Sequence, residues 1–237
     1  MENSDIRKQF KSKERISKHG EVFTDEKEVK SMCDLFEHEC ERVDSRFFEP
    51  ACGNGNFLAE ILSRKLNIVY KKFKKNKYDF ERYSILAISS LYGVDLMNDN
   101  VNECKNRLYK IWEKMYKKIF KDNCDNETIK TVSFILSLNI VCGNALTLMK
   151  VDSDGNDTKE PIIFPEWSLI SGAKFKRRDF RFDVLLMSKE NPHKRKENTL
   201  FENELDKFLE IHPSTNEYLP KPINEYEPIH YKKIKDL

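Results

Sequence analysis

A glycine turn that follows a short apolar run is the part of the sequence best suited to chemistry. The apolar run ends in Glu49, and Gly53-Asn54-Gly55 then opens directly into the amphipathic stretch 57–62. Gly53 and Gly55 can adopt positive φ and carry no Cβ, so a ligand can lie against bare backbone. A helix that begins just beyond them directs free N–H groups and a positive dipole toward the same place. The pattern therefore predicts a strand, a glycine turn and a helix N-terminus that bind a ligand together.

The order of residues around this turn narrows the kind of ligand. The dinucleotide fingerprint needs a third glycine at position 58, which is Leu. The remaining pattern, acid-x-Ala-x-Gly-x-Gly, resembles the cofactor loop of S-adenosylmethionine-dependent methyltransferases. The fuller string Phe-Glu-Pro-Ala-Cys-Gly-Asn-Gly-Asn-Phe-Leu, at 48–58, resembles the version in N6-adenine DNA methyltransferases of restriction–modification systems. This resemblance implies that the following residues contact S-adenosylmethionine: Glu49, Pro50, Ala51, Gly53 and Gly55.

A second segment of the same family lies upstream of the turn. Gly20-Glu21-Val22-Phe23-Thr24 is similar to the family's Gly-x-Phe-Phe-Thr-Pro segment, with Asp25 in place of the proline. The resemblance implies that Phe23 and Thr24 fold over the cofactor and that Thr24 contacts its methionine carboxylate. The residues alone also predict a helix N-terminus here, because Thr24-Asp25 precedes two acids in a first turn. Both roles are compatible.

Two further predicted strands end in polar residues. The stretch 92–96 predicts a strand that ends at Asp95, and an acid at this place accepts hydrogen bonds from ribose hydroxyls in nucleotide-binding sheets. Asp95 lies about forty residues past the turn, which an inserted helix over 81–91 explains. The stretch 139–146 resembles the family's third strand, in which Asp or Asn after Gly reads the adenine ring. The resemblance adds these residues to the cofactor site: Leu96, Asn144 and Ala145.

The elements that must hold these residues follow from apolar periodicity. Apolar residues recur at helical spacing over 57–65, 101–120 and about 127–136, so that helices separate the predicted strands. The predicted fold is α/β: a Rossmann-like S-adenosylmethionine-dependent methyltransferase domain, with a mostly parallel sheet flanked by helices and an irregular C-terminal tail. The predicted divisions are an N-terminal arm with the cofactor-covering segment at 1–25, a methyltransferase-like domain at 26–190 and a tail at 191–237.

Composition restricts how the protein could meet nucleic acid. The 237 residues include 42 Lys and Arg against 40 Asp and Glu, a net charge of +2, so there is no overall attraction to DNA. A local surface is predicted at 70–80, where five lysines alternate with aromatic residues. A solvated loop or helix face explains that pattern as well.

Other features of the chain exclude several kinds of protein. No apolar run approaches the ~20 residues of a membrane span, and the polar N-terminus shows no signal peptide. The six cysteines form no Cys-x-x-Cys pair, and Cys33, His38 and Cys40 fit no familiar zinc spacing. The expectation is a reduced, cytoplasmic protein that binds neither a metal nor a membrane.

The segment that would hold a target base is the weak part of the resemblance. In the family, Asn/Asp-Pro-Pro-Tyr/Phe accepts hydrogen bonds from the base amine and stacks on its ring; no such tetrapeptide occurs here. One substitute is 161–167, an apolar strand with Trp167 at its end. The other is the apolar run 182–186, which resembles the strand itself, followed by Asn191. Trp167 and Asn191 are therefore the catalytic candidates.

Two functions follow from these features. The leading one is adenine-N6 methylation of DNA in a restriction–modification or phage-defence system, with S-adenosylmethionine as cofactor. Because no target-recognition domain is evident, the partners expected are DNA and a separate specificity or recognition subunit. The alternative is a catalytically silent cofactor-binding or DNA-binding subunit that scaffolds or regulates a partner.

Overall fold

Three parallel strands form the centre of the structure, a computed structural model that describes residues 24–187, 206–215 and 217–237. The strands β1 (Phe47–Glu49), β2 (Leu91–Asp95) and β3 (Ile140–Asn144) lie side by side in that order. Both of their pairings are parallel. Two further strands, β4 (Met149–Val151) and β5 (Asp157–Pro161), continue the sheet in antiparallel fashion. The predicted strands at 92–96 and 139–146 are confirmed.

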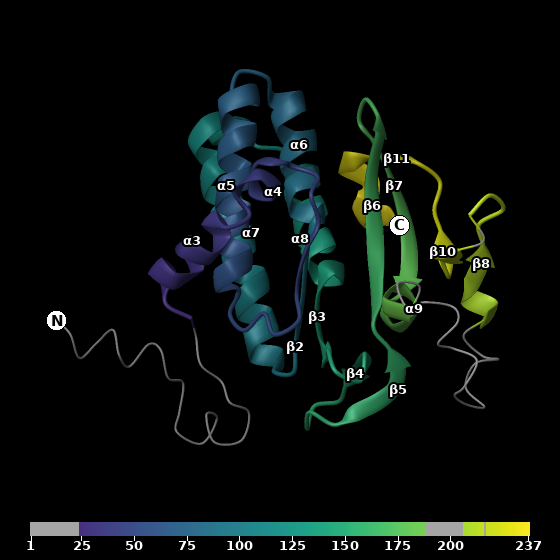
Figure 1. Ribbon diagram of the computed structural model, residues 1–237. Helices are drawn as coiled ribbons and strands as arrows, with labels where there is room; N and C mark the ends of the chain where they lie inside the picture. The colour runs from purple at the N-terminus through teal and green to yellow at the C-terminus, as the bar shows by residue number, and fades with distance from the viewer. Residues whose placement is uncertain (1–23, 188–205, 216) are drawn as a thin grey trace, which may run out of the picture.

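The connections between the parallel strands are helical, as expected for parallel pairing. Helices precede and follow β1, and then link β2 to β3. Their bounds are α3 (Glu26–Asp34), α4 (Glu37–Glu41), α5 (Asn56–Phe73), α6 (Lys77–Ser89), α7 (Asn98–Phe120), η1 (Lys121–Asn123) and α8 (Asn126–Asn139). The helix predicted at 81–91 is α6, so the insertion before β2 is a helix that packs into the fold (Figure 1).

Local sequence explains where several of these helices begin. Asp25, Asn76 and Asp125 each accept a hydrogen bond from a backbone N–H of the first turn of α3, α6 and α8. Such caps satisfy donors that a helix N-terminus otherwise leaves unpaired. The predicted start of a helix at Asp25 is therefore confirmed.

The two faces of β2 are covered by different elements. Successive residues of a strand point to opposite faces. On one face, a Cβ added to Gly93 would meet Cys52 and Leu58, so α5 lies close to the backbone there. On the other face, the hydroxyl of Tyr92 donates to the carbonyl of Pro165 at 2.9 Å. Leu91, Tyr92 and Val94 are all buried, as expected for a central parallel strand.

A long antiparallel hairpin covers the second face of β2. It consists of β6 (Ile163–Ser171) and β7 (Lys174–Arg181), and α9 (Phe182–Met187) follows it directly. Figure 1 shows the hairpin standing between the helices and the C-terminal strands. The apolar run 182–186 was expected to be a strand; here it is helical, so that prediction is wrong.

The C-terminal residues join this hairpin instead of forming an irregular tail. The strands β10 (Asn224–Glu225) and β11 (Ile229–His230) both pair with β7. A small separate hairpin is made by β8 (Leu209–Ile211) and β9 (Tyr218–Pro220), after the short helix η3 (Asp206–Phe208). The prediction of an irregular tail is thus wrong for 206–215 and 217–237, because β8 pairs with β9, and β10 and β11 pair with β7.

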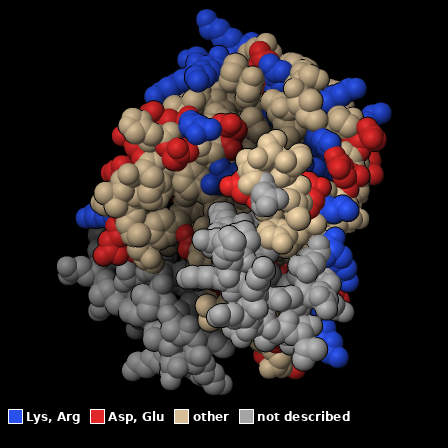
Figure 2. All heavy atoms as spheres, turned by 45° about the vertical axis from the view of Figure 1, so that its right-hand side comes forward, with Lys and Arg blue, Asp and Glu red and all other residues tan. Residues whose placement is uncertain are grey.

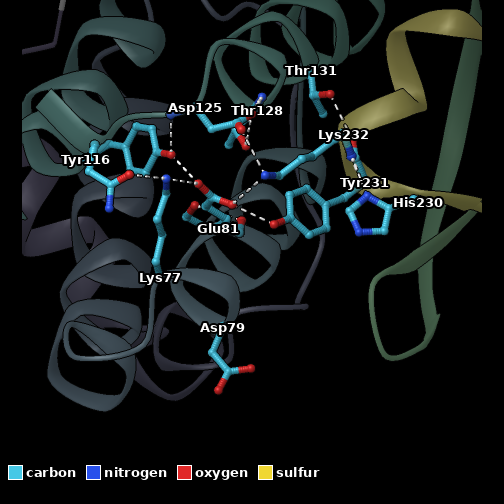
Figure 3. A network of polar contacts seen from close by, with 12 residues as sticks. Lys77, Asp79, Glu81, Tyr116, Asp125, Thr128, Thr131, His230, Tyr231 and Lys232 are labelled. Atoms are coloured by element: carbon cyan, nitrogen blue, oxygen red, sulfur yellow. Dashed lines mark hydrogen bonds and ion pairs between the residues drawn. The ribbon is translucent and has the colours of Figure 1, made fainter. Parts of the chain in front are cut away.

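A buried carboxylate fixes the last helix, η4 (Tyr231–Asp236), to the helical layer (Figure 3). Glu81 of α6 is 1% exposed and accepts hydrogen bonds from the hydroxyls of Tyr116 and Tyr231, the latter at 2.6 Å. Lys232 pairs with Asp125 at 2.9 Å and lies 3.7 Å from Glu81. These five residues, called the Glu81 network below, join parts of the chain up to 150 positions apart.

The lysine-rich stretch 70–80 spans the end of α5 and the beginning of α6. Lys71, Lys72, Lys74 and Lys75 are exposed there. Figure 2 shows basic side chains gathered at the end of the molecule where these two helices meet. In the part of the chain that the structure describes, no helix has both the length and the apolar character needed to cross a membrane.

Candidate functional site

The carboxyl ends of β1, β2 and β3 open into one pocket of about 500 Å³, called the carboxyl-end pocket below. Its volume lies within the range typical of small-molecule sites, and the crevice at the strand ends is where open parallel sheets bind ligands. The sequence-predicted cofactor contacts that line it are Thr24, Glu49, Pro50, Ala51, Gly53, Asp95, Leu96, Asn144 and Ala145. The structure therefore brings together residues from four separate segments. Phe23, also predicted to contact the cofactor, lies outside the described residues.

The glycine turn is fastened to the end of β2. Gly53 has a φ of 50°, and its N–H donates to Asp95 Oδ2 at 2.9 Å. The N–H of Cys52 donates to the carbonyl of Val94 at 2.9 Å. The turn and the carboxylate thus hold each other at one wall of the pocket.

Asp95 is oriented by several donors. Besides Gly53, the backbone N–H of Met97 donates to Oδ1 at 2.9 Å and the Asn100 amide donates to Oδ1 at 3.2 Å. An ionised carboxylate has about four acceptor sites, so lone-pair capacity remains for a ligand hydroxyl. Asp95 can position the turn and accept from a ligand at once.

The side-chain amide of Asn144 is already hydrogen-bonded within the protein. Its Oδ1 accepts from the N–H of Leu146 at 3.0 Å, and its Nδ2 donates to Asp157 Oδ1 at 3.0 Å. The side chain therefore lines the pocket, but a direct contact with a purine ring would compete with these hydrogen bonds. The predicted ring-reading role stays a prediction.

Gly55 does not line the pocket. Its φ is 85°, and a Cβ built there would come within 2.6 Å of Cys104 Sγ and 3.3 Å of Cys104 Cα. The missing side chain therefore lets α7 approach the start of α5. The expected ligand contact at Gly55 is corrected to a packing role, because the open side of this glycine faces a helix.

Thr24 is tied to the beginning of α5. The Asn56 amide donates to the Thr24 carbonyl at 3.0 Å, and Arg107 of α7 donates to Asn56 Oδ1. The side chain of Asp25 meanwhile caps α3. One short segment thus starts a helix and lines the pocket, and the predicted contact of Thr24 with the cofactor stays a prediction.

The polar lining suits a ligand that carries donors. Burial raises the pKa of Glu49, and a hydrogen bond from the backbone of Ala51 opposes part of that rise. Asn54 was missed at the sequence level: its Oδ1 is buried and has no hydrogen-bond partner among the described residues. This oxygen is buried, so Asn54 lines the pocket wall without exposing that acceptor to the open volume. In the sequence, only the position of Asn54 between Gly53 and Gly55 could have indicated that it lines the pocket.

Trp167, the catalytic candidate that the structure describes, does not form a site for a base. Trp167 of β6 is 4% exposed, and its indole N–H donates to Asn139 Oδ1 at 2.9 Å. The Arg177 guanidinium lies over the ring, 5.6 Å from its centre. Because the side chain is almost fully buried, with its N–H and one ring face used in the core, the predicted stacking role of Trp167 is wrong. Asn191 lies outside the described residues.

Comparison with known proteins gives one relative. Over 155 residues the chain is 30% identical to the tRNA (guanine(6)-N2)-methyltransferase of Methanocaldococcus jannaschii. That stretch is 63% of this chain but only 37% of the relative, so the chain spans little more than a third of the protein it matches. No family model matches the chain, and no solved structure matches it. Over three fifths of its length, the chain is therefore similar to a methyltransferase of nucleic acid.

Proposed function

We propose that this chain is the cofactor-binding part of an S-adenosylmethionine-dependent methyltransferase that modifies an exocyclic amine of a purine in DNA. The observation that carries the proposal is the carboxyl-end pocket, which gathers the glycine turn and the ends of three parallel strands. The similarity to a tRNA methyltransferase supports the reaction type.

The residues of the pocket fit this cofactor. Asp95 has acceptor capacity for ribose hydroxyls. Glu49 and Asp95 give the pocket an acidic lining, which favours a ligand with a sulfonium and an ammonium charge. Leu96 and Leu146, 40% and 94% exposed, offer apolar surface at the ends of β2 and β3 for a flat ring.

The cofactor would supply one methyl group to the amine nitrogen. A nitrogen–carbon bond would form as the sulfur–carbon bond breaks, and the amine would lose a proton. The described residues hold and orient the donor. An acceptor for the amine must come from elsewhere, because the base-holding candidate in the described chain, Trp167, is in the core.

The choice of DNA adenine rests on the string at 48–58, which resembles the adenine-N6 enzymes of restriction–modification systems. The relative is named for guanine-N2 of tRNA. Both targets are exocyclic amines of purines that must leave the base stack before reaction. Phage defence or restriction–modification is the proposed setting, and a recognition subunit is the proposed partner.

A silent cofactor-binding subunit is the second candidate. It is favoured by the burial of Trp167 and by the lack of an Asn/Asp-Pro-Pro-aromatic segment in the sequence. The two candidates share the cofactor and differ in whether methyl transfer occurs.

The experiment has two measurements on the full chain. Titration calorimetry with S-adenosylmethionine is expected to give one site; a folded chain without binding would overturn the proposal. Transfer of tritiated methyl groups is then measured on duplex DNA, single-stranded DNA and tRNA.

Little methyl transfer is expected from the chain alone. Strong transfer to DNA would eliminate the silent candidate, whereas transfer to tRNA only would reassign the substrate, and Asn191→Ala would test the remaining catalytic candidate.

A further inference from the structure

The strand β1 is paired on one side only within the described chain. Its pairing with β2 is parallel, and the Phe47 N–H donates to the Ser90 carbonyl at 2.9 Å. Successive backbone N–H and C=O groups of a strand alternate in direction. The N–H and C=O of Phe48 therefore point away from β2, and no other described strand pairs with them. Pro50, which has no N–H, limits this edge at its carboxyl end.

An apolar groove runs beside this free edge. It has a volume of about 580 Å³, and its apolar lining includes Phe48, Phe164, Phe182, Leu185 and Leu186. Phe48 is 41% exposed and Leu186 is 42% exposed. An open strand edge can pair with another chain, and a contiguous exposed apolar patch can mark an interaction site.

The order of the strands indicates what belongs at the edge. Doubly wound sheets arrange their strands 3-2-1-4, so that strand 1 lies between strand 2 and a fourth parallel strand. Here the order β3-β2-β1 is present, and the described chain places no strand in the fourth position. Ligands bind at the switch point between strands 1 and 4. The carboxyl-end pocket begins at that point, since Glu49 ends β1 and lines it.

We propose that the free edge of β1 binds a parallel β-strand from a partner polypeptide, and that this strand carries the base-holding segment. The inference rests on the proposed function. A strand docked parallel to β1 ends beside the glycine turn, so residues that follow it would face the methyl donor. This is strand addition to an open sheet edge, with backbone hydrogen bonds to Phe48 and apolar side chains in the groove.

The groove favours a strand over the other occupants. Glu166 in the groove is paired with Arg46 at 2.7 Å and with Arg178. The groove therefore has no large excess of positive charge that would attract a polyanion such as nucleic acid. A second copy of this chain would join through a two-fold axis, which makes the two β1 strands antiparallel. Its carboxyl end would then point away from the pocket.

The test uses a synthetic peptide of about ten residues, a typical strand plus turn, with alternating apolar residues and a final Asn-Pro-Pro-Tyr. Calorimetry with the full chain measures its affinity, and hydrogen exchange measures protection of the Phe48 amide. Leu186→Arg changes the groove, whereas Ile170→Arg changes a similarly exposed apolar residue of β6 outside it. A peptide N-methylated along one edge is the matched ligand control. S-adenosylmethionine binding is measured on every sample.

The expected result is saturable peptide binding with about tenfold greater protection at Phe48, unchanged by Ile170→Arg and weakened about tenfold by Leu186→Arg or by N-methylation. Equal binding to both variants would overturn the proposal. So would a Phe48 amide that is already protected in the free chain or in a self-associated form. Cofactor binding without peptide binding overturns the docking alone, whereas peptide binding without cofactor binding overturns the proposed function.

Discussion

Two clusters of polar residues in this protein use carboxylates in opposite ways. Asp95 lies at the edge of the carboxyl-end pocket and accepts from the backbone of Gly53 and Met97 while retaining acceptor capacity. Glu81 is buried in the Glu81 network, where two tyrosine hydroxyls and two lysines within 4 Å surround it (Figure 3). One carboxylate shapes a place for a ligand, and the other joins distant parts of the chain.

The difference separates a binding site from a structural contact. A buried polar group whose partners all come from the protein contributes stability or specificity of packing, and has nothing left to offer a ligand. The carboxyl-end pocket keeps acceptor capacity at Asp95 and has both apolar and acidic lining. The number of polar contacts alone would have favoured the Glu81 network as a functional site.

The largest expected effect is on the Glu81 network. Glu81→Ala removes the acceptor of Tyr116 and Tyr231 and leaves Lys77 and Lys232 without their buried partner. Breaking a buried ionic network of this kind costs roughly 3–5 kcal/mol. Urea unfolding should show that loss, while the affinity for S-adenosylmethionine at low temperature stays unchanged.

The control for Glu81 is Tyr231→Phe, which removes one hydroxyl and should cost about 1 kcal/mol. If Glu81→Ala lowers the free energy of unfolding no more than this control does, the network is not a cooperative unit. A selective loss of cofactor binding in Glu81→Ala would reverse the assignment of the two clusters.

The second effect concerns Gly55, which ends the glycine turn in sequence but packs against α7. Gly55→Ala forces a Cβ to within 2.6 Å of Cys104 Sγ at a φ of 85°. The backbone strain and the collision together should cost roughly 2–4 kcal/mol of the free energy of unfolding. Gly155→Ala is the matched control: its φ is 83°, and nothing lies within 4 Å of the new Cβ. Gly155→Ala should lower the free energy of unfolding by only about 1 kcal/mol. Equal losses in the two variants would mean that α7 moves away from the new Cβ at position 55 without an energetic cost.

The third effect is on the pocket itself. Asp95→Ala should weaken S-adenosylmethionine roughly ten- to hundredfold, because a charge-assisted hydrogen bond contributes ~1.5–3 kcal/mol and the variant also frees the Gly53 turn. Titration calorimetry measures the affinity, with the exposed Asp154→Ala as control. An unchanged dissociation constant for Asp95→Ala would remove this carboxylate from the site.

The last effect, measured as a slope with pH and not as a single loss of stability, concerns Lys65, a buried cation whose oxygen partners are neutral. Its Nζ donates to the Val43 carbonyl at 3.2 Å, to Ser90 Oγ at 2.6 Å and to the Ser45 carbonyl. Burial lowers the pKa of Lys65 to about 7. Between about 7 and the unfolded value of about 10.4 the unfolded chain binds more protons, so stability rises with pH.

Below pH 7 both states are protonated, and this contribution to the pH dependence disappears. The extra slope is at most ~1.4 kcal/mol per pH unit. Lys65→Met should flatten the difference in unfolding free energy between pH 7 and 10, measured by urea titration at each pH. If wild type and variant keep the same slope, the three oxygen acceptors hold the ammonium at its ordinary pKa.

The sequence by itself determined the parts of the site that depend on local order. Residues at the ends of parallel strands meet at one edge of the sheet, so finding Glu49, Asp95 and Asn144 each at the end of an apolar run was enough to bring them together. Asp25 could be placed as a helix cap for the same reason, since a cap depends on its immediate neighbours.

Tertiary structure alone decided the roles that depend on distant neighbours. Trp167 is a core residue because Asn139 and Arg177 take its N–H and its ring, and no pattern near position 167 specifies them. Gly55 packs because Cys104 lies opposite it. The strands β10 and β11 form because β7 leaves one edge free of β6, and Glu81 is structural because Tyr231 reaches it from 150 positions away. In each case the deciding contact is long-range, and its free energy exists only once the chain has folded.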